Sequence, residues 1–224
     1  MGYGGSCFPK DVGSLDHIAL TNGHSFELLR AVIAVNNRQR LLPLQVLRKR
    51  FGRLFGVPVG VLGLAFKPQT DDIREAPAID LVRLLHDEGA SVKAHAPQAN
   101  FKASKVIPGS VSLVESVLCC ASGVQALVLM TEWPEFVEVD WQEIARCMKP
   151  PRFLFDGRNI LDPGKMSDLG FDYQGVGRGN IASTELRSHP EEKAYHQQRP
   201  LLAAREQEIL PGETEQQLTE FPSF

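Results

Sequence analysis

VGVLGLA, at residues 59–65, is the first of several short apolar runs that alternate with stretches of helical periodicity. Continuous apolar runs are typical of strands buried on both faces, as in parallel sheets. Further strands are expected at residues 91–96, 126–130 and 153–156, with an edge strand at 171–176. Helices are expected at residues 76–88, 111–121 and 141–148. We therefore predict an α/β fold with a parallel sheet, right-handed crossovers and helices on both faces.

The residues before this sheet are predicted to be helical. Pro9 and Asp11 mark a helix start, and Thr21-Asn22-Gly23 mark its end. Apolar residues recur at helical spacing from Ser25 to about Phe51, where Pro43 is expected to kink or divide the helix. The glycine-rich residues 2–6 have no strand or helix before them, so a larger fold is expected to hold them.

Composition narrows the classes of function. Hydrophobic residues make up 43% of the 224 residues, and the net charge is −3. The sequence has no basic stripe, so nucleic acid is not an expected partner. No apolar run approaches the roughly 20 residues of a membrane span. We expect a cytoplasmic protein that does not contact a membrane.

Cysteine usage argues against a disulfide framework or a zinc site. The chain has four cysteines, of which Cys119 and Cys120 are adjacent, and no Cys-x-x-Cys pair. We therefore expect a reducing environment and no metal. Beyond Ala182 the chain contains eight Glu, five Gln and only four Lys or Arg, a composition typical of disorder.

Cys7 lies between the glycine-rich loop and a helix start, where backbone N–H groups and the helix dipole favour a thiolate. It is either a nucleophile or a small buried cysteine, which is the usual role of the residue. Asp11, four residues later, is either a base near that sulfur or a partner of the helix dipole. We interpret Cys119, Cys120 and Cys147 only as small buried cysteines.

Four segments carry a resemblance to a known family. They are GYGGSCFPKD at residues 2–11, GLAFKP with TDDIREAP at 63–77, TEWPEF at 131–136 and FDGRN at 155–159. In this order they are similar to segments of the UDP-glucose and GDP-mannose dehydrogenases, over residues 2 to about 176. The resemblance implies residues 1–55 as the active-site loop with a helical dimerisation segment. It implies residues 56–182 as a Rossmann-like nucleotide-sugar domain, leaving 183–224 as the tail.

The resemblance also implies a reaction. The family oxidises a primary alcohol to a carboxylate with two NAD, and its cysteine, here Cys7, forms a thiohemiacetal and then a thioester. Asp11 would assist hydrolysis of the thioester. Cys7, Lys10 and Arg74 would lie near the NAD cofactor.

The substrate residues that the resemblance implies are spread over three segments. Gly2, Tyr3 and Gly4 would approach the sugar nucleotide with their backbone. Phe66 and Lys67 would offer an aromatic surface and a cation to a uridine diphosphate. Arg158 would also reach the substrate. Taken alone, Arg74 and Arg158 are surface salt-bridge partners.

The sequence departs from the family in one respect, since no Gly-x-Gly-x-x-Gly motif follows a strand. We therefore expect the C-terminal portion of an NAD-dependent dehydrogenase that converts UDP-glucose to UDP-glucuronate. We expect a homodimer, with the NAD-binding half possibly encoded separately. The alternatives are a catalytically inactive nucleotide-sugar-binding fragment, a GDP-mannose or other nucleotide-sugar dehydrogenase, and an unrelated α/β domain. Phe8 and Ile73 are more similar to the UDP-glucose members.

Overall fold

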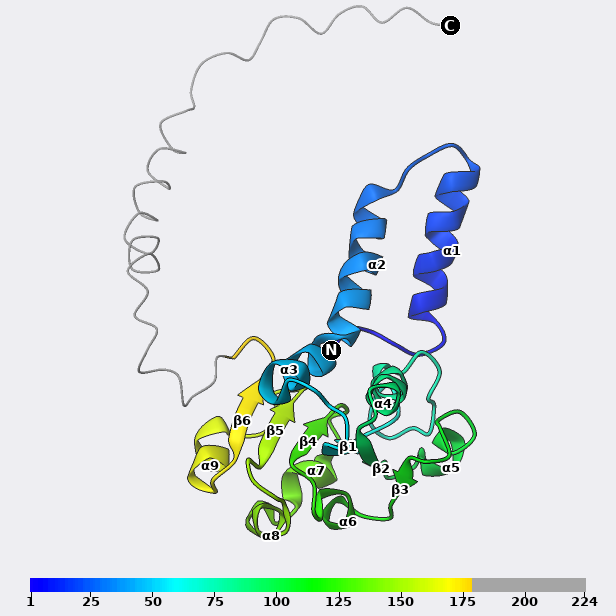
Figure 1. The fold of residues 1–224 in the computed structure, drawn as a ribbon. Helices are drawn as coiled ribbons and strands as arrows, with labels where there is room; N and C mark the ends of the chain where they lie inside the picture. The colour runs from blue at the N-terminus through cyan, green and yellow to red at the C-terminus, as the bar shows by residue number, and fades with distance from the viewer. Residues whose placement is uncertain (179–224) are drawn as a thin grey trace, which may run out of the picture. The chain divides into compact units, whose positions relative to one another are not determined.

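The computed structural model describes residues 1–178, in which a helical segment precedes a six-stranded sheet (Figure 1). The strands are β1 Pro58–Leu62, β2 Ser91–His95, β3 Ser112–Leu113, β4 Ala126–Leu129, β5 Phe153–Asp156 and β6 Asp172–Gly175. The helices are α1 Phe8–Thr21, α2 Glu27–Arg40, α3 Leu42–Phe51, α4 Pro77–Asp87, α5 Asn100–Ala103, α6 Val117–Ala121, α7 Pro134–Glu138, α8 Trp141–Cys147 and α9 Pro163–Asp168. The predicted tail, residues 183–224, lies outside the described residues.

The sheet is parallel throughout, with strand order β3-β2-β1-β4-β5-β6. At the carboxyl end of β1, Leu62 pairs with His95 of β2 on one side and with Leu129 of β4 on the other. The strand order reverses between β1 and β4, and doubly wound sheets bind ligands outside the carboxyl ends at such a point. The predicted Rossmann-like α/β fold is confirmed.

Two hydrophobic cores cover the two faces of the sheet. One core packs α3 and α4 against the sheet and includes Leu47, Leu81 and Val128. The other packs α6, α7 and α8 against the opposite face and includes Phe136 and Leu127. Successive residues of β4 therefore enter different cores, which is why this strand is apolar throughout.

Helices α1 and α2 lie side by side and form a hairpin (Figure 1). Arg30 Nε lies 3.1 Å from Asp16 Oδ1 across it. On these two helices only Val12 and Asn36 are buried. The predicted division of the long helix occurs at Leu41, where α2 ends and α3 begins, because Pro43 fits only the first turn of a new helix.

Two predicted elements differ from the structure. The helix expected at residues 111–121 is instead β3 followed by the shorter α6, because the Ser116 hydroxyl accepts a hydrogen bond from Cys119 N and caps the helix there. The first strand ends at Leu62 rather than Ala65, because Gly63 turns the chain with φ +86°. A side chain at Gly63 would place its Cβ 2.6 Å from Thr131 Cβ.

Three short helices, α5, α7 and α9, were not predicted, because four to six residues show no resolvable periodicity. Among residues 1–178, no helix has both the length and the apolar character needed to cross a membrane.

Candidate active site

The four segments singled out in the sequence gather at the carboxyl ends of β1, β4 and β5. Gly5 N donates a hydrogen bond to the Arg74 carbonyl at 3.1 Å, which joins the glycine-rich loop to the segment after β1. Gly63 packs directly on Thr131, which follows β4. Arg158, which follows β5, contacts the segment after β4. The topological switch point therefore carries all four segments.

Helix α2 anchors the glycine-rich loop through two polar side chains. Asn36, only 6% exposed, accepts a hydrogen bond from Tyr3 N at 2.7 Å and donates to Tyr3 O at 3.3 Å. One turn later, the Arg40 guanidinium donates to the carbonyl oxygens of Tyr3 and Glu75 and pairs with the carboxylates of Glu75 and Asp80. These contacts tie the loop, α2 and α4 together.

The loop glycines are required by packing within the protein. At Gly4 an added Cβ would collide with the Glu75 carbonyl oxygen. At Gly2, where φ is +75°, it would lie 2.6 Å from Asn36 Oδ1. At Gly5 it would lie 2.9 Å from the Phe66 ring. The loop backbone therefore lies against the protein itself at all three positions.

Cys7 is exposed at the start of α1, with its Sγ 3.7 Å from Ser6 Oγ. Asp11 N donates to the Cys7 carbonyl at 2.8 Å. The Asp11 carboxylate lies 3.8 Å from Lys10 Nζ, and in the described part of the chain it makes no hydrogen bond with the Cys7 sulfur. Burial raises the pKa of Cys120 to about 12, which leaves that thiol unreactive.

Arg74 forms a two-pronged pair with Asp72, with Nε 2.9 Å from Oδ1 and Nη2 2.7 Å from Oδ2. This hydrogen-bonded pair lowers the pKa of Asp72 to about 2. The pKa of Arg74 is raised, chiefly by Asp72 and to a smaller extent by Cys7. The exposed guanidinium is therefore an electrostatic neighbour of the candidate nucleophile.

Phe66 and Lys67 follow β1, and the Phe66 ring meets the glycine-rich loop. The Phe66 ring is partly buried against Gly5. Lys67 is exposed, and its Nζ lies 5.3 Å from the centre of the Phe66 ring. Together they form an aromatic surface with an adjacent cation.

Among the described residues, the Arg158 guanidinium is held through its Nε. This atom donates to the Met130 carbonyl at 2.8 Å and lies 2.9 Å from Glu132 Oε2. Within residues 1–178 its two Nη nitrogens have no hydrogen-bond partner, so the fork remains available to an anion.

A buried carboxylate, Asp156, supports the loop that carries Arg158. Its Oδ1 accepts from Arg158 N at 3.0 Å, and its Oδ2 accepts from Leu161 N at 2.9 Å and from the Tyr173 hydroxyl at 3.0 Å. Burial, followed by the charge of Asp156, raises the pKa of Tyr173, so this hydroxyl stays protonated and donates.

Sequence profiles of one family match both the N-terminal helical segment and the sheet domain. Residues 1–38 match the central domain of the UDP-glucose/GDP-mannose dehydrogenase family, and residues 60–163 match its UDP binding domain. The chain belongs to this family. Its members are dehydrogenases, a class of oxidoreductases, and the resemblance found in the four segments is confirmed.

Relatives within the family match over most of this chain. A UDP-glucose 6-dehydrogenase of Pseudomonas aeruginosa is 46% identical over 183 residues, covering 79% of this chain and 40% of the relative. The structure of a UDP-glucose dehydrogenase from Pyrobaculum islandicum has 35% identity and a TM-score of 0.69, covering 80% of this chain and 38% of that one. The structure of a UDP-D-ManNAc dehydrogenase from Pyrococcus horikoshii has 30% identity and a TM-score of 0.62. It covers 80% of this chain and 40% of that one. The chain thus spans about 40% of the length of its family relatives.

Several residues of this candidate site carried no signal in the sequence. Asn36 and Arg40 look like ordinary polar residues of a surface helix, and only their spacing of four places them on one helix face. Glu132 and Asp156 lie within recognised segments, but their contacts with Arg158 depend on which strands are neighbours in the sheet.

Proposed function

We propose that this chain binds UDP-glucose at the carboxyl ends of β1, β4 and β5, as the C-terminal part of an NAD-dependent UDP-glucose 6-dehydrogenase. The observation that carries the proposal is the hydrogen bond from Gly5 N to the Arg74 carbonyl. It fixes the Cys7 loop against the segment that bears Phe66 and Lys67. The proposed nucleophile and the proposed diphosphate-binding cation therefore share one edge of the sheet.

In this proposal each side chain has a distinct task. The Phe66 ring and the Lys67 ammonium bind the uridine diphosphate, and the free Nη groups of Arg158 bind the nucleotide sugar. The Cys7 sulfur adds to the aldehyde carbon of the half-oxidised sugar and later holds the acyl group as a thioester. Asp11 assists the water that releases UDP-glucuronate and restores the thiol.

The cations beside Cys7 fit the phosphate groups of the implied cofactor, NAD. Lys10 and Arg74 are exposed cations beside Cys7, with side chains 73% and 68% exposed, and they suit the phosphates of a dinucleotide. Two NAD molecules, bound in turn, would each accept one of the two hydrides that the oxidation removes. Arg74 is already paired with Asp72 through two of its nitrogens, so it would meet the cofactor with its remaining Nη1.

The other nucleotide sugars of the family remain alternatives to UDP-glucose. The Pyrococcus horikoshii structure, named as a UDP-D-ManNAc dehydrogenase, resembles this chain with a TM-score close to that of the UDP-glucose enzyme. The described contacts involve the cations proposed to bind the diphosphate and the Cys7 thiol. They do not involve groups that would distinguish one sugar from another.

Cysteine alkylation tests whether the sugar nucleotide reaches Cys7. We expect UDP-glucose to slow the reaction of Cys7 with iodoacetamide severalfold, because the bound sugar covers this exposed sulfur. Cys119 is also exposed but lies on α6, so it provides a control within the same chain. Peptide mass spectrometry measures both rates. Equal protection of both cysteines, or of neither, would count against the proposed placement of the sugar.

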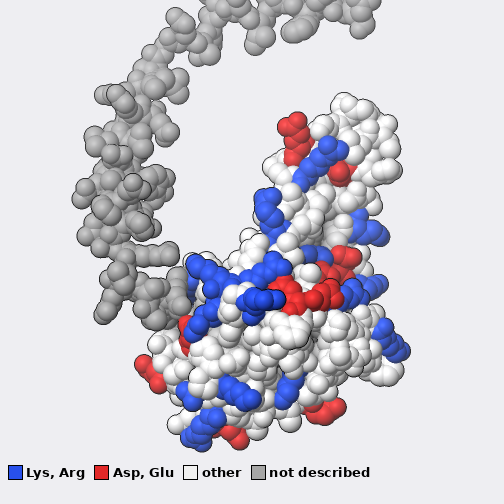
Figure 2. Space-filling model, in the orientation of Figure 1, with Lys and Arg blue, Asp and Glu red and all other residues white. Residues whose placement is uncertain are grey.

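We also propose that the α1–α2 hairpin pairs with a second copy of the chain. Its exposed apolar side chains include Ile18, Leu28 and Val35, which are 56%, 72% and 47% exposed. Residues 17–26 at its tip contain no Lys, Arg, Asp or Glu, and Figure 2 shows this end of the hairpin in white. Exposed apolar side chains on one hairpin whose tip carries no Lys, Arg, Asp or Glu favour an interface.

The hairpin proposal predicts a dimer in analytical ultracentrifugation at micromolar concentration. Leu28→Glu should shift the chain towards monomer, because the charge would be buried at the interface. Phe101→Glu is the matched control, since Phe101 is 73% exposed on α5. A monomeric wild-type chain, or equal dissociation by both variants, would refute the hairpin interface.

A further inference from the structure

Tyr3 connects helix α2 to the start of α1, where Cys7 lies. Its backbone is held from one side, because Asn36 accepts a hydrogen bond from Tyr3 N at 2.7 Å and donates to Tyr3 O at 3.3 Å. Its ring packs edge to face on the Phe8 ring, with the ring centres 4.6 Å apart and the planes at 79°. Phe8 follows Cys7 directly and is the first residue of α1. A chain of contacts therefore runs from Asn36 through Tyr3 to the residue beside the thiol.

Cys7 is fixed from both of its sides in the sequence. Before it, Gly5 N donates to the Arg74 carbonyl at 3.1 Å. After it, α1 begins at the exposed Phe8, and the buried residue of this helix is Val12. The first turn of α1 therefore has little core packing of its own, and the ring contact with the loop restrains it. Because the thiol is exposed, its position depends on these anchors rather than on packing around the sulfur.

Asn36 is a buried side chain around which the loop fits closely. An added Cβ at Gly2 would lie 2.6 Å from its Oδ1. The side chains proposed to bind the nucleotide lie on other segments. We propose that Asn36 and Tyr3 are positioning residues, which hold the Cys7 sulfur against the bound sugar without binding the nucleotide through their side chains. This inference rests on the function proposed above, in which Cys7 is the nucleophile. Placement of the sulfur and affinity for the nucleotide sugar are then separable.

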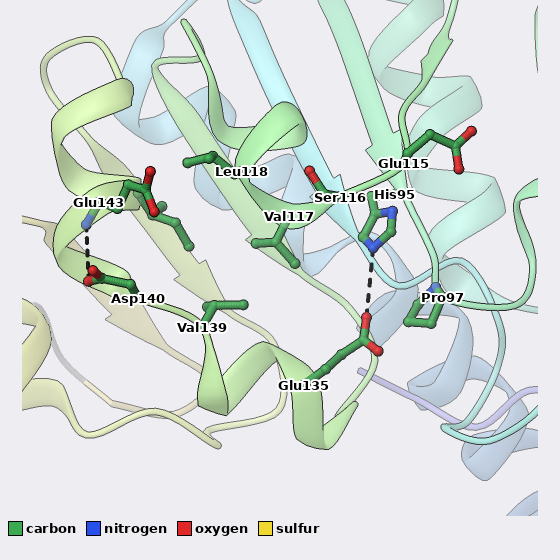
Figure 3. A pocket seen from close by; sticks show the side chains of 11 residues that line it. His95, Pro97, Glu115, Ser116, Val117, Leu118, Glu135, Val139, Asp140 and Glu143 are labelled. Carbon is green, nitrogen blue, oxygen red and sulfur yellow. Dashed lines mark hydrogen bonds and ion pairs between the residues drawn. The ribbon is translucent and has the colours of Figure 1, made fainter.

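A cavity at the carboxyl end of β2 supplies a control away from this chain of contacts. Its volume is about 480 Å³, and its lining includes His95, Glu135, Asp140 and Glu143 (Figure 3). The His95 ring is partnered by the Val114 carbonyl at 2.9 Å and by Glu135 at 3.7 Å. The acidic lining would repel a diphosphate. Glu135→Gln should therefore leave the binding of a nucleotide sugar unchanged.

Exchange of Tyr3 N–H with solvent, followed by NMR on the 224-residue chain, tests the anchoring by Asn36 without any ligand. Asn36→Ala removes the acceptor and should speed this exchange about tenfold, the effect expected for the loss of one hydrogen bond. Asn37→Ala is the matched control, because Asn37 is exposed next to Asn36 on the same helix. It should leave the exchange rate unchanged. Equal exchange rates in the two variants would overturn the anchoring role of Asn36.

Alkylation of Cys7 by iodoacetamide, with and without UDP-glucose, tests the positioning itself. Asn36→Ala and Tyr3→Ala should each remove most of the severalfold protection that UDP-glucose gives Cys7. Both should keep the calorimetric affinity for UDP-glucose within about twofold, because the proposed nucleotide contacts are untouched. Tyr3→Phe retains the ring and should retain the protection, as should Asn37→Ala and Glu135→Gln.

The split between protection and affinity separates positioning from folding, because a variant that fails to fold loses both together. Loss of both in Asn36→Ala and in Tyr3→Ala, or loss of protection in Glu135→Gln as well, would overturn the positioning role. A wild-type chain without protection of Cys7 would refute the proposed function. Protection of the wild type that persists in Asn36→Ala and Tyr3→Ala would refute only the positioning role.

Discussion

Mixing the 224-residue chain with UDP-glucose and NAD should yield no NADH. Hydride transfer requires the nicotinamide to lie within about 3 to 3.5 Å of the sugar carbon, and this positioning contributes about 7 to 11 kcal/mol to lowering the barrier. Lys10 and Asp11 beside Cys7 have side chains 73% and 66% exposed. In the described residues, the surroundings of Cys7 are therefore open to water.

The expected loss is a factor of about 10⁵ or more relative to a family enzyme that holds the nicotinamide in place. Absorbance of NADH measures it, with the Pseudomonas aeruginosa UDP-glucose 6-dehydrogenase as the positive control. If a separate polypeptide supplies an NAD-binding half, adding it should restore NADH formation. Steady NADH production by this chain alone, abolished by Cys7→Ala, would show that these residues suffice for the reaction.

Replacing Asp156 with alanine should destabilise the sheet domain by about 3 to 5 kcal/mol. The carboxylate is 0% exposed and accepts hydrogen bonds from Arg158 N, Leu161 N and the Tyr173 hydroxyl. Removing it leaves up to three buried donors without an acceptor, at about 1 to 3 kcal/mol each before non-additivity. Urea unfolding followed by circular dichroism measures the change.

Two controls separate this effect from a general loss of charge. Tyr173→Phe removes only one of the three donors and should cost about 1 to 2 kcal/mol. Asp168→Ala changes an exposed carboxylate in α9 and should alter the free energy of unfolding by less than about 0.5 kcal/mol. If Asp156→Ala and Asp168→Ala have similar stabilities, the hydrogen bonds of Asp156 do not support the loop as described.

Sequence alone predicted the sheet well because its strands are buried on both faces. Residues 126–130 and 153–156 are continuous apolar runs, and the structure places strands there as β4 and β5. The run at 111–121 was assigned to a single helix because its alternation is short and its cap, Ser116, lies in the middle. Periodicity cannot distinguish a two-residue edge strand from the start of a helix.

Candidate site residues could be proposed from the sequence where they lie in a contiguous segment, but not where they depend on tertiary contacts. Cys7, Lys67 and Arg158 stood out through their surrounding residues. The side chains that position these segments, Asn36 and Arg40, act through backbone carbonyl and N–H groups far away in sequence. Such partners become visible only once the fold brings the loop onto α2.

The proposed binding of UDP-glucose is tested most directly by isothermal titration calorimetry on the wild-type chain and on Lys67→Ala. Lys67 is exposed beside Phe66, so its removal should not affect folding. Lys149→Ala is the control, because Lys149 is an exposed residue before β5, at the amino ends of the strands. We expect saturable UDP-glucose binding that Lys67→Ala weakens about tenfold, the effect of one charge-assisted hydrogen bond, and that Lys149→Ala leaves unchanged. Absence of binding by the wild-type chain, or equal effects of the two substitutions, would contradict a nucleotide-sugar site at the carboxyl ends of β1, β4 and β5.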